Sequence, residues 1–543
     1  MATGSRGPCD ACGPRVTNPY ASSALTDGPA LRLTSTRGRW VLATAVLGSA
    51  VAFLEATVVN VALPELGRDL DADVAGLQWT INGYLLTLAS LILLGGSLGD
   101  RYGRRRIFEI GVVWFTAASV LCAVAPNIET LVAARVLQGV GGALLTPGSL
   151  AIIEATFREE DKGRAIGAWS ALTGVAGAVG PLLGGYLIDS VTWRAIFLIN
   201  IPLGAFVVWA SRRHIPETHD PTITGRLDLA GSALATIGLG GITFALIQAP
   251  EHGLESPMVF GALAIGIIGV IAFVRTERRA PQPMLPLSIF SSRQFTGANL
   301  VTFVVYAALG AMFFLFVVFL QIALGYSAIE AGAASLPVTA LMLALSSRAG
   351  ELAQRIGPRI PLTVGPLVVA LGMLMMSGID AGDSYVTDIL PGVFVFGLGL
   401  SLVVAPVTIT VLAAADPRQA GIASGVNNAV ARTAGLLAVA VLPLIAGLSG
   451  SDYQDPEAIA DGFTIGMRFA AVLAAAGGLV ALATIRDDVL ERAREPARRP
   501  CQEEIERVPA RHCAVDGTPL TPRRAREPLP TAVPAGSTPA PRA

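Results

Sequence analysis

Residues 96–106 read GSLGDRYGRRR, and residues 350–359 read GELAQRIGPR. The two stretches share glycine at their first and eighth positions, leucine at the third, and arginine at the sixth and tenth. Each of them follows a long apolar segment and carries several arginines. We infer that part of the chain has been duplicated and that each copy is a bundle of helices with this loop in the same place.

Apolar segments of about 20 residues are long enough to cross ~30 Å of hydrocarbon as helices. Fourteen of them occur along the chain. The predicted spans cover residues 40–63, 77–98, 107–125, 129–152, 165–187, 194–212, 228–249, 257–274, 296–321, 329–348, 360–379, 388–413, 421–447 and 463–485.

The position of the second loop divides these spans into groups. It follows the tenth span, whereas two directly joined six-helix halves would place it after the eighth. The seventh and eighth spans are therefore interpreted as an inserted hairpin, and their uncharged centres indicate a lipid-facing pair. The predicted parts are a disordered cytoplasmic tail at 1–38, a first half at 39–213, the insertion with its linkers at 214–294, a second half at 295–486, and a second disordered cytoplasmic tail at 487–543.

Composition supports a membrane protein. Hydrophobic residues make up 52% of the 543 residues, and only 15% are charged. A net charge of -1 gives no reason to expect nucleic acid as a partner. Arginines concentrate in alternate connections between spans, which places those connections and both termini in the cytoplasm.

Catalytic and cofactor signatures are missing from the sequence. It contains no G-x-x-x-x-G-K-[ST] loop for nucleotides and no HExxH. Cys9 and Cys12 form a C-x-x-C without a second pair at zinc-binding spacing, so we expect no metal site. The chain is predicted not to be an enzyme and to need no cofactor.

Several motifs resemble one known family. GSLGDRYGRRR is similar to the cytoplasmic signature loop of the major facilitator superfamily. The stretches ATVVNVALP (56–64), ARVLQGVGGA (134–143), GVAGAVGPLLGG (174–185) and WRAIFLINIPLG (193–204) resemble its drug:proton antiporter branch with fourteen helices. The resemblance covers roughly residues 40–485. It implies an all-α integral membrane bundle of the major-facilitator type that uses the proton gradient as its energy source.

The fifth span carries the most specific of these motifs. Its glycines recur at spacings of three and four, which allows close approach to a neighbouring helix, and its proline permits a bend. The resemblance implies that this stretch prevents leakage through the antiporter, while ordinary small-residue packing is the alternative. The residues concerned are Gly174, Gly177, Gly180, Pro181, Gly184 and Gly185.

Two ionisable residues lie deep within predicted spans. Glu55 and Arg135 fall at matching depth in the first and fourth spans, ~10–12 Å below the outer surface. A charge at this depth is costly unless it is paired or hydrated, so we expect the two to meet directly or through Gln138. Burial disfavours the charged form of Glu55 and Arg135 favours it, and this balance suits proton coupling. A static ion pair is the alternative; the family commonly has Asp where Glu55 stands.

The signature loop is predicted to act as a conformational latch. Asp100 could accept hydrogen bonds from arginines or from a helix N-terminus in the other half, and this bond would break when the halves move. A basic loop that only sets topology is the alternative. The latch residues are Gly96, Asp100, Arg101, Gly103, Arg104 and Arg105.

Polar and aromatic side chains are candidates for a substrate cavity, those of the first two spans near its outer half and those of the thirteenth span near the midplane. Trp79 could instead anchor the chain at the membrane surface. Arg432 is a buried cation without an acid at its depth in the second half, and substrate binding, gating and structural hydrogen bonding are all open to it. The candidates are Asn60, Trp79, Asn82, Tyr84, Asn427, Asn428 and Arg432.

We interpret the chain as a proton-coupled secondary transporter that exports small hydrophobic or amphipathic molecules, such as drugs or antibiotics, by alternating access. An exporter of a metabolite, amino acid or siderophore is the nearest alternative, and a non-transporting membrane sensor or scaffold is a more distant one. The expected partners are a small-molecule substrate, protons and the lipid bilayer. The expected location is a bacterial cytoplasmic membrane, with the monomer as the functional unit.

Overall fold

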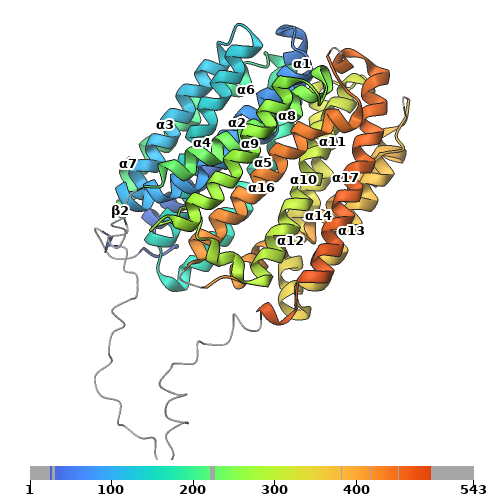
Figure 1. Cartoon of the computed structure of the whole chain (residues 1–543). Coiled ribbons are helices and arrows are strands. Elements are labelled where there is room, and N and C mark those ends of the chain that lie inside the picture. Colours follow the sequence, from blue (N-terminus) through green and yellow to red (C-terminus); the bar gives the residue numbers. More distant parts are fainter. Residues whose placement is uncertain are drawn as a thin grey trace, which may run out of the picture. The chain divides into compact units, whose positions relative to one another are not determined.

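The structure is a computed structural model that describes residues 25–26, 31–219, 227–380, 382–416, 419–450 and 452–490 (Figure 1). These residues contain 14 helices that are long and apolar enough to cross a membrane. The predicted number of spans is confirmed, and each observed span overlaps a predicted one. Several helices continue past the apolar stretch, as α1 does to Asp69.

The first half is built from six spans, of which the sixth is interrupted at Ile199. Its elements are β1 (Leu25–Thr26), α1 (Thr36–Asp69), α2 (Val74–Tyr102), α3 (Arg104–Ala123), α4 (Ile128–Thr156), α5 (Glu159–Ser190), α6 (Ala195–Leu198), α7 (Asn200–His214) and β2 (Thr218–His219). β1 pairs with β2 in an antiparallel bridge of two residues each. Side chains cap several helix starts, such as Asp73 on Gly76 N–H and Asn127 on Thr130 N–H.

The insertion and the second half supply eight spans, of which the tenth and twelfth are broken into shorter helices. The insertion is α8 (Leu229–His252) and α9 (Pro257–Arg279). The second half comprises η1 (Leu287–Ser291), α10 (Arg293–Ile322), α11 (Ala328–Ala334), α12 (Leu336–Ile356), α13 (Arg359–Met376), η2 (Tyr385–Ile389), α14 (Leu390–Ser401), α15 (Val404–Ala413), α16 (Ala420–Ala446), η4 (Asp452–Gln454) and α17 (Pro456–Thr484).

The inserted hairpin lies across the seam between the halves. In Figure 1, α8 and α9 run side by side, and α8 packs on both α2 and α16. Glycines at the contact, Gly238 and Gly266 among them, let the two helices approach backbone to backbone. The outer surface of α9 is exposed, with Phe260 at 68% and Ile268 at 65%. Contact of this surface with lipid stays a prediction.

The two ends of the bundle differ in charge. We call the end that carries the connections 101–106 and 355–359 the arginine face, and the opposite end, with Asp69, Asp189 and Asp455, the acidic face. The halves are joined near the acidic face. There the Gln78 amide donates to the Val439 carbonyl at 2.6 Å, and the Gln321 amide donates to the Val61 carbonyl at 2.9 Å.

Parts of both predicted tails are folded, which corrects the prediction of disorder there. Leu31 N–H donates to the carbonyl of Thr156, the last residue of α4, and the Leu31 carbonyl accepts from Arg158 N–H. α1 then begins at Thr36. Val489 and Leu490, in a short helical turn that follows α17, are buried, as expected for apolar side chains that pack against the bundle. Residues 1–24 and 491–543, including Cys9 and Cys12, lie outside the described residues.

Candidate functional site

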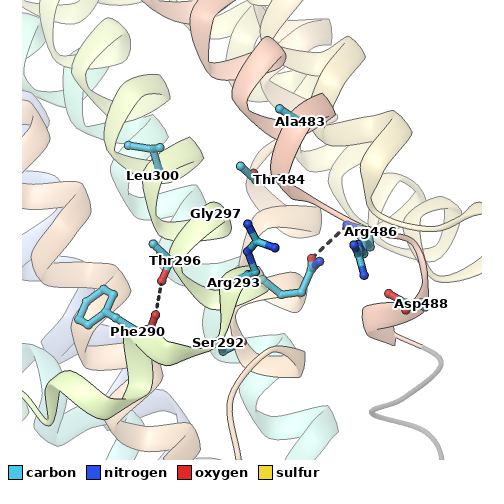
Figure 2. A pocket seen from close by; sticks show the side chains of 11 residues that line it. Phe290, Ser292, Arg293, Thr296, Gly297, Leu300, Ala483, Thr484, Arg486 and Asp488 are labelled. Carbon is cyan, nitrogen blue, oxygen red and sulfur yellow. Dashed lines mark hydrogen bonds between the residues drawn. The ribbon is translucent and has the colours of Figure 1, made fainter.

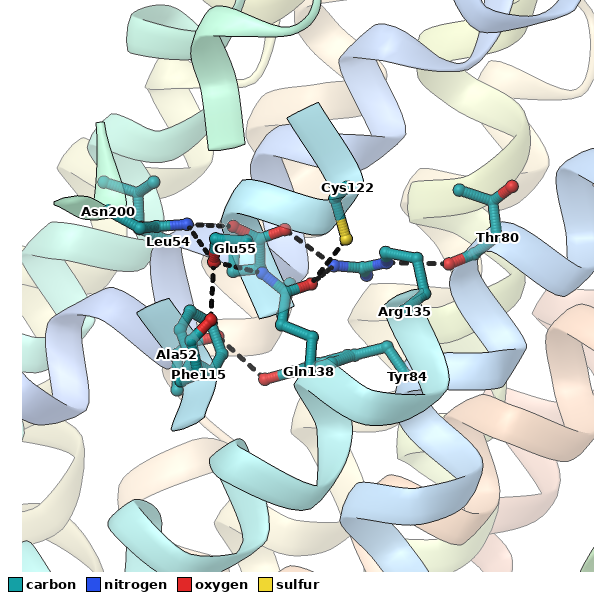
Figure 3. A network of polar contacts seen from close by, with 12 residues as sticks. Ala52, Leu54, Glu55, Thr80, Tyr84, Phe115, Cys122, Arg135, Gln138 and Asn200 are labelled. Atoms are coloured by element: carbon teal, nitrogen blue, oxygen red, sulfur yellow. Dashed lines mark hydrogen bonds and ion pairs between the residues drawn. The ribbon is translucent and has the colours of Figure 1, made fainter. Parts of the chain in front are cut away.

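A buried ion pair joins α1 to α4. Arg135 Nη1 lies 2.6 Å from Glu55 Oε1, and the two side chains are 1% and 0% exposed (Figure 3). The predicted proximity of these residues is therefore observed as direct contact. Both charges are removed from water, so their mutual attraction is weakly screened.

Further groups complete the environment of the arginine. Its Nε donates to the Thr80 carbonyl at 2.9 Å, and its Nη1 also donates to Gln138 Oε1 at 2.5 Å. The Tyr84 ring lies 4.6 Å from the guanidinium carbon, and the Phe197 ring lies 5.9 Å away. The guanidinium thus has a carboxylate, two amide-type oxygens and aromatic faces around it, which is how proteins stabilise a buried cation.

Asn200 is a member of this cluster that the sequence analysis missed. Its amide nitrogen donates to Glu55 Oε2 at 2.9 Å and to Ser119 Oγ at 3.2 Å (Figure 3). Ser119 Oγ also accepts from Gln138 Nε2 at 2.8 Å. The sequence offers one indication of this role, because Asn200 is the single amide side chain inside the apolar motif WRAIFLINIPLG. The pairing itself depends on α7 packing against α1 and α3, which no local pattern predicts.

The cluster stabilises the ionised form of Glu55, because each carboxylate oxygen accepts a hydrogen bond, one from Arg135 and one from Asn200. It also holds one unused acceptor: the buried Asn200 Oδ1 has no hydrogen-bond partner among the described residues. Rotation of the Asn200 amide by about 180° would exchange its nitrogen and oxygen. The same residue can then donate to the carboxylate or accept the O–H of the protonated acid.

The glycine motif of α5 lies between the halves. Gly180 and Gly184 face Thr57 and Val58 of α1, close enough that an added Cβ would lie 2.2 and 3.0 Å from their side chains. Gly185 faces α11 of the second half, where a Cβ would lie 2.4 Å from the Ala328 carbonyl oxygen.

Other parts of the α5 motif take different positions. A Cβ on Gly177 would have ordinary contact with Phe53. The Pro181 carbonyl lies against Gly332 of α11. Gly174 is the exception to the predicted close packing, because no atom lies within 4 Å of the place its Cβ would occupy.

The acidic face is held by a charged helix cap. The Asp189 carboxylate at the end of α5 accepts from the backbone N–H groups of Ala328 and Ile329, at 3.3 and 2.9 Å. These are the first residues of α11, where a negative charge is favoured by the helix dipole. The cap therefore ties the two halves together beside Gly185.

At the signature loop, Asp100 is predicted to pair with an arginine. The structure shows that this arginine is Arg104, four residues further along, whose Nη2 lies 2.8 Å from Asp100 Oδ1. The pair lies within the first half, and the structure shows no contact of Asp100 with the second half among the described residues. Arg101 lies over its neighbour Tyr102 at 5.5 Å. Gly96 contacts Pro147 of α4. The latch role stays a prediction.

Glu217 is the main partner of this loop that the sequence analysis missed. Its carboxylate accepts from the backbone N–H groups of Arg105 and Arg106, at 3.1 and 3.2 Å, and so caps α3. Gly103 has φ of 109°, and a Cβ there would lie 2.6 Å from Glu217 Oε1, so only glycine suits this position.

The second half repeats this arrangement. Asp487 Oδ1 accepts from Arg359 N–H at 3.1 Å, and Gly357 has φ of 89° beside the same carboxylate. Glu217 and Asp487 each stand three residues after the end of the sixth span of their half. The duplication visible in the two loops thus includes the acids that cap the following helices.

The predicted cavity residues divide into separate groups. Tyr84 belongs to the ion-pair cluster, and Trp79 packs on Phe244 of α8 with ring centres 6.1 Å apart. Tyr84 therefore faces α4 and Trp79 faces α8, and their role in lining a substrate cavity stays a prediction. Asn82 is fully buried, and both of its amide atoms lack partners among the described residues. Asn60 is half-buried and bonds only weakly to the Ala56 carbonyl, at 3.5 Å.

The candidates on α16 face two directions. Asn427 donates to Thr302 Oγ1 at 2.8 Å and to Asn299 Oδ1 at 3.3 Å, both on α10, and this is a structural use. Arg432 is half-buried, and its guanidinium carbon lies 5.1 Å from the Phe53 ring of α1. It forms no ion pair with an acid in the part of the chain that the structure describes. Asn428 bonds to the Ser424 carbonyl of its own helix.

A bundle of two related helical halves, the first of which holds an ion pair buried among its spans, is the architecture of a polytopic membrane transporter. The sequence model described as Major Facilitator Superfamily matches residues 45–440. The chain belongs to this family.

Relatives and solved structures agree with this assignment. The chain is 36% identical to "Multidrug resistance protein Stp" of Mycobacterium tuberculosis, over 73% of each protein. It is 34% identical to "Probable actinorhodin transporter" of Streptomyces coelicolor, over 91% of this chain and 87% of that one. The "Methylenomycin A resistance protein" of Bacillus subtilis is 33% identical, over 77% and 90%. A crystal structure of the peptide transporter POT shares the fold at 16% identity, with a TM-score of 0.61, over 84% of this chain and 96% of that one.

Proposed function

We propose that this transporter exports small hydrophobic or amphipathic molecules in exchange for protons and that Glu55 carries the proton. The observation that carries the proposal is the buried cluster of Glu55, Arg135 and Asn200. Its donors hold the carboxylate, and its unused Asn200 acceptor can receive the acid.

Alternating access is supported by the different packing of the two faces. Near the acidic face, α5 and α11 touch through Gly185 and Asp189. Toward the arginine face, an added Cβ on Gly163, Gly167 or Gly174 of α5 would meet no atom within 4 Å. We interpret this conformation as closed at the acidic face and open toward the arginine face, which the arginine distribution places in the cytoplasm.

The direction and the cargo are inferred from relatives. Proteins named for multidrug resistance, methylenomycin A resistance and actinorhodin transport are 33–36% identical to this chain over the aligned residues. Export of a drug or antibiotic across a bacterial cytoplasmic membrane, by a monomer with both termini in the cytoplasm, is therefore our first proposal. Export of an endogenous metabolite on the same scaffold is the second.

The coupling role is tested in proteoliposomes that contain a pH-sensitive dye and an imposed proton gradient. Addition of cargo should cause proton movement through the wild-type protein and none through Glu55→Gln. The matched control is Glu129→Gln, which changes an exposed acid at the start of α4 and should retain wild-type exchange. Cargo-driven proton movement through Glu55→Gln at the wild-type rate would refute the coupling role.

The cargo class needs a separate experiment. The gene is expressed in a susceptible bacterial host, and growth is measured against a panel of aromatic antibiotics. Resistance to one structural class, lost in Glu55→Gln, supports drug export. No resistance, together with active proton exchange driven by amino acids or other cell metabolites, would favour the second candidate.

A further inference from the structure

A cavity of about 670 Å³ lies at the arginine face of the second half, apart from the coupling cluster (Figure 2). One wall is the first two turns of α10, and the other is the end of α17 with the residues that follow it. Figure 2 shows Arg293 on the α10 wall and Arg486 on the opposite one. The cavity is thus lined by two arginines from segments far apart in the sequence.

The charge of the lining favours an anion. Arg293 and Arg486 are both exposed, and neither pairs with an acid in the described part of the chain. Asp488 also lines the cavity, which leaves one positive charge in excess. Guanidinium groups recognise phosphate through planar pairs of N–H donors. Two of them on opposite walls suit a ligand that offers several acceptor oxygens.

The walls of the cavity are fixed by their own hydrogen bonds. Gln294 Oε1 accepts from the backbone N–H of Arg486 at 3.0 Å, which joins the two walls. Thr296 Oγ1 donates to the Phe290 carbonyl at 2.7 Å, and Ser292 caps the start of α10. The arginine side chains therefore project from a preformed frame.

The cavity lies at the depth where lipid headgroups are expected. α10 begins at Arg293 and α17 ends at Thr484, so the cavity lies where these helices leave the hydrocarbon region. Leu300, which also lines it, is 45% exposed and lies seven residues further along α10, ~10 Å deeper into the membrane. A soluble anion would have no use for this apolar side.

We propose that the cavity binds an anionic phospholipid, with the phosphate between Arg293 and Arg486 and an acyl chain along Leu300. The lipid joins the start of α10 to the end of α17 and so stabilises the second half. This site is independent of the proton-coupling and cargo proposals.

Lipid binding is tested with the purified full chain in detergent by native mass spectrometry and thermal unfolding. Phosphatidylglycerol should bind and raise the Tm, and phosphatidylcholine should do so much less. Arg293→Gln with Arg486→Gln should weaken phosphatidylglycerol binding about thirtyfold, which corresponds to ~2 kcal/mol. The matched control is Arg213→Gln with Arg278→Gln, which removes two exposed arginines outside the cavity and should bind as wild type.

Three outcomes would overturn the proposal. Phosphatidylcholine could bind as well as phosphatidylglycerol, or the double variant could keep full binding while its lipid-free Tm equals that of the wild type. Inorganic phosphate could displace phosphatidylglycerol and protect the protein equally well. That last result would assign the site to a soluble phosphate and exclude the lipid.

Discussion

At the scale of single residues, the proposed proton coupling depends on the groups that hold Glu55. Asn200→Ala removes one donor from the carboxylate, together with an amide oxygen that has no other partner among the described residues and could accept the proton of the acid. Leaving a buried polar group without its partner costs about 1–3 kcal/mol. We expect proton-coupled exchange to fall about tenfold or more, measured as the initial rate in proteoliposomes.

The control for this variant is Asn127→Ser, which exchanges one helix-capping side chain for another at the exposed start of α4. It should leave the exchange rate unchanged. An Asn200→Ala protein with wild-type rates, beside an inactive Glu55→Gln, would show that Asn200 only fills space.

The members of this cluster differ in how well the sequence predicts them. Glu55 and Arg135 could be paired by counting residues from the ends of two spans, because charges in a membrane are rare and need partners. Ser119 and Asn200 could not, because neutral polar side chains are common in helices and often bond to their own backbone. Their roles became visible only when the packing of α3 and α7 was known.

At the scale of helices, the contact between α5 and α11 is proposed to control closure of the acidic face. Gly185→Ala would place a methyl group 2.4 Å from the Ala328 carbonyl, and such overpacking costs about 1–3 kcal/mol. The population should shift away from the closed state by about 5- to 150-fold. A single cysteine at position 329 should then react faster with a membrane-impermeant maleimide added at the acidic face.

Gly174→Ala is the internal control, since an added Cβ at this position of α5 has open space around it. It should label at the wild-type rate. Equal labelling in the Gly185→Ala protein would mean that this contact does not set the conformational equilibrium.

The helix caps formed by Glu217 and Asp487 lead to a second prediction at this scale. Glu217→Gln and Asp487→Asn each remove the charge that caps a following helix, α3 or α13. Loss of a cap costs about 0.5–2 kcal/mol, so each variant should lower the Tm by about 2 °C in thermal unfolding. The sites lie in different halves, so the double variant should show the sum of the two effects. A double variant no less stable than either single one would contradict independent caps.

At the scale of the whole molecule, the sequence predicts which spans are present better than it predicts how the two halves pack against each other. The span count and the inserted hairpin follow from apolar length and from the place of the repeated loop, because the bilayer forces both. The joining of the two halves near the acidic face does not, because contacts such as that of Gln78 with Val439 join residues 361 positions apart through backbone carbonyls. Such carbonyls are present in every residue and give no pattern in the sequence.

The contact between Arg432 and Phe53 offers a test of whether the two halves move relative to each other during transport. The arginine belongs to α16 and the ring to α1, and they lie 5.1 Å apart. A cation–π contact of this kind contributes about 0.5–2 kcal/mol, and it must break or be replaced by cargo when the halves move. Arg432→Gln should therefore reduce cargo transport about tenfold while thermal stability changes little. Arg432→Lys keeps the charge and should recover part of the rate. Transport by Arg432→Gln at the wild-type rate would assign Arg432 to structure alone, because a group that meets cargo or gates its path cannot lose its charge without effect.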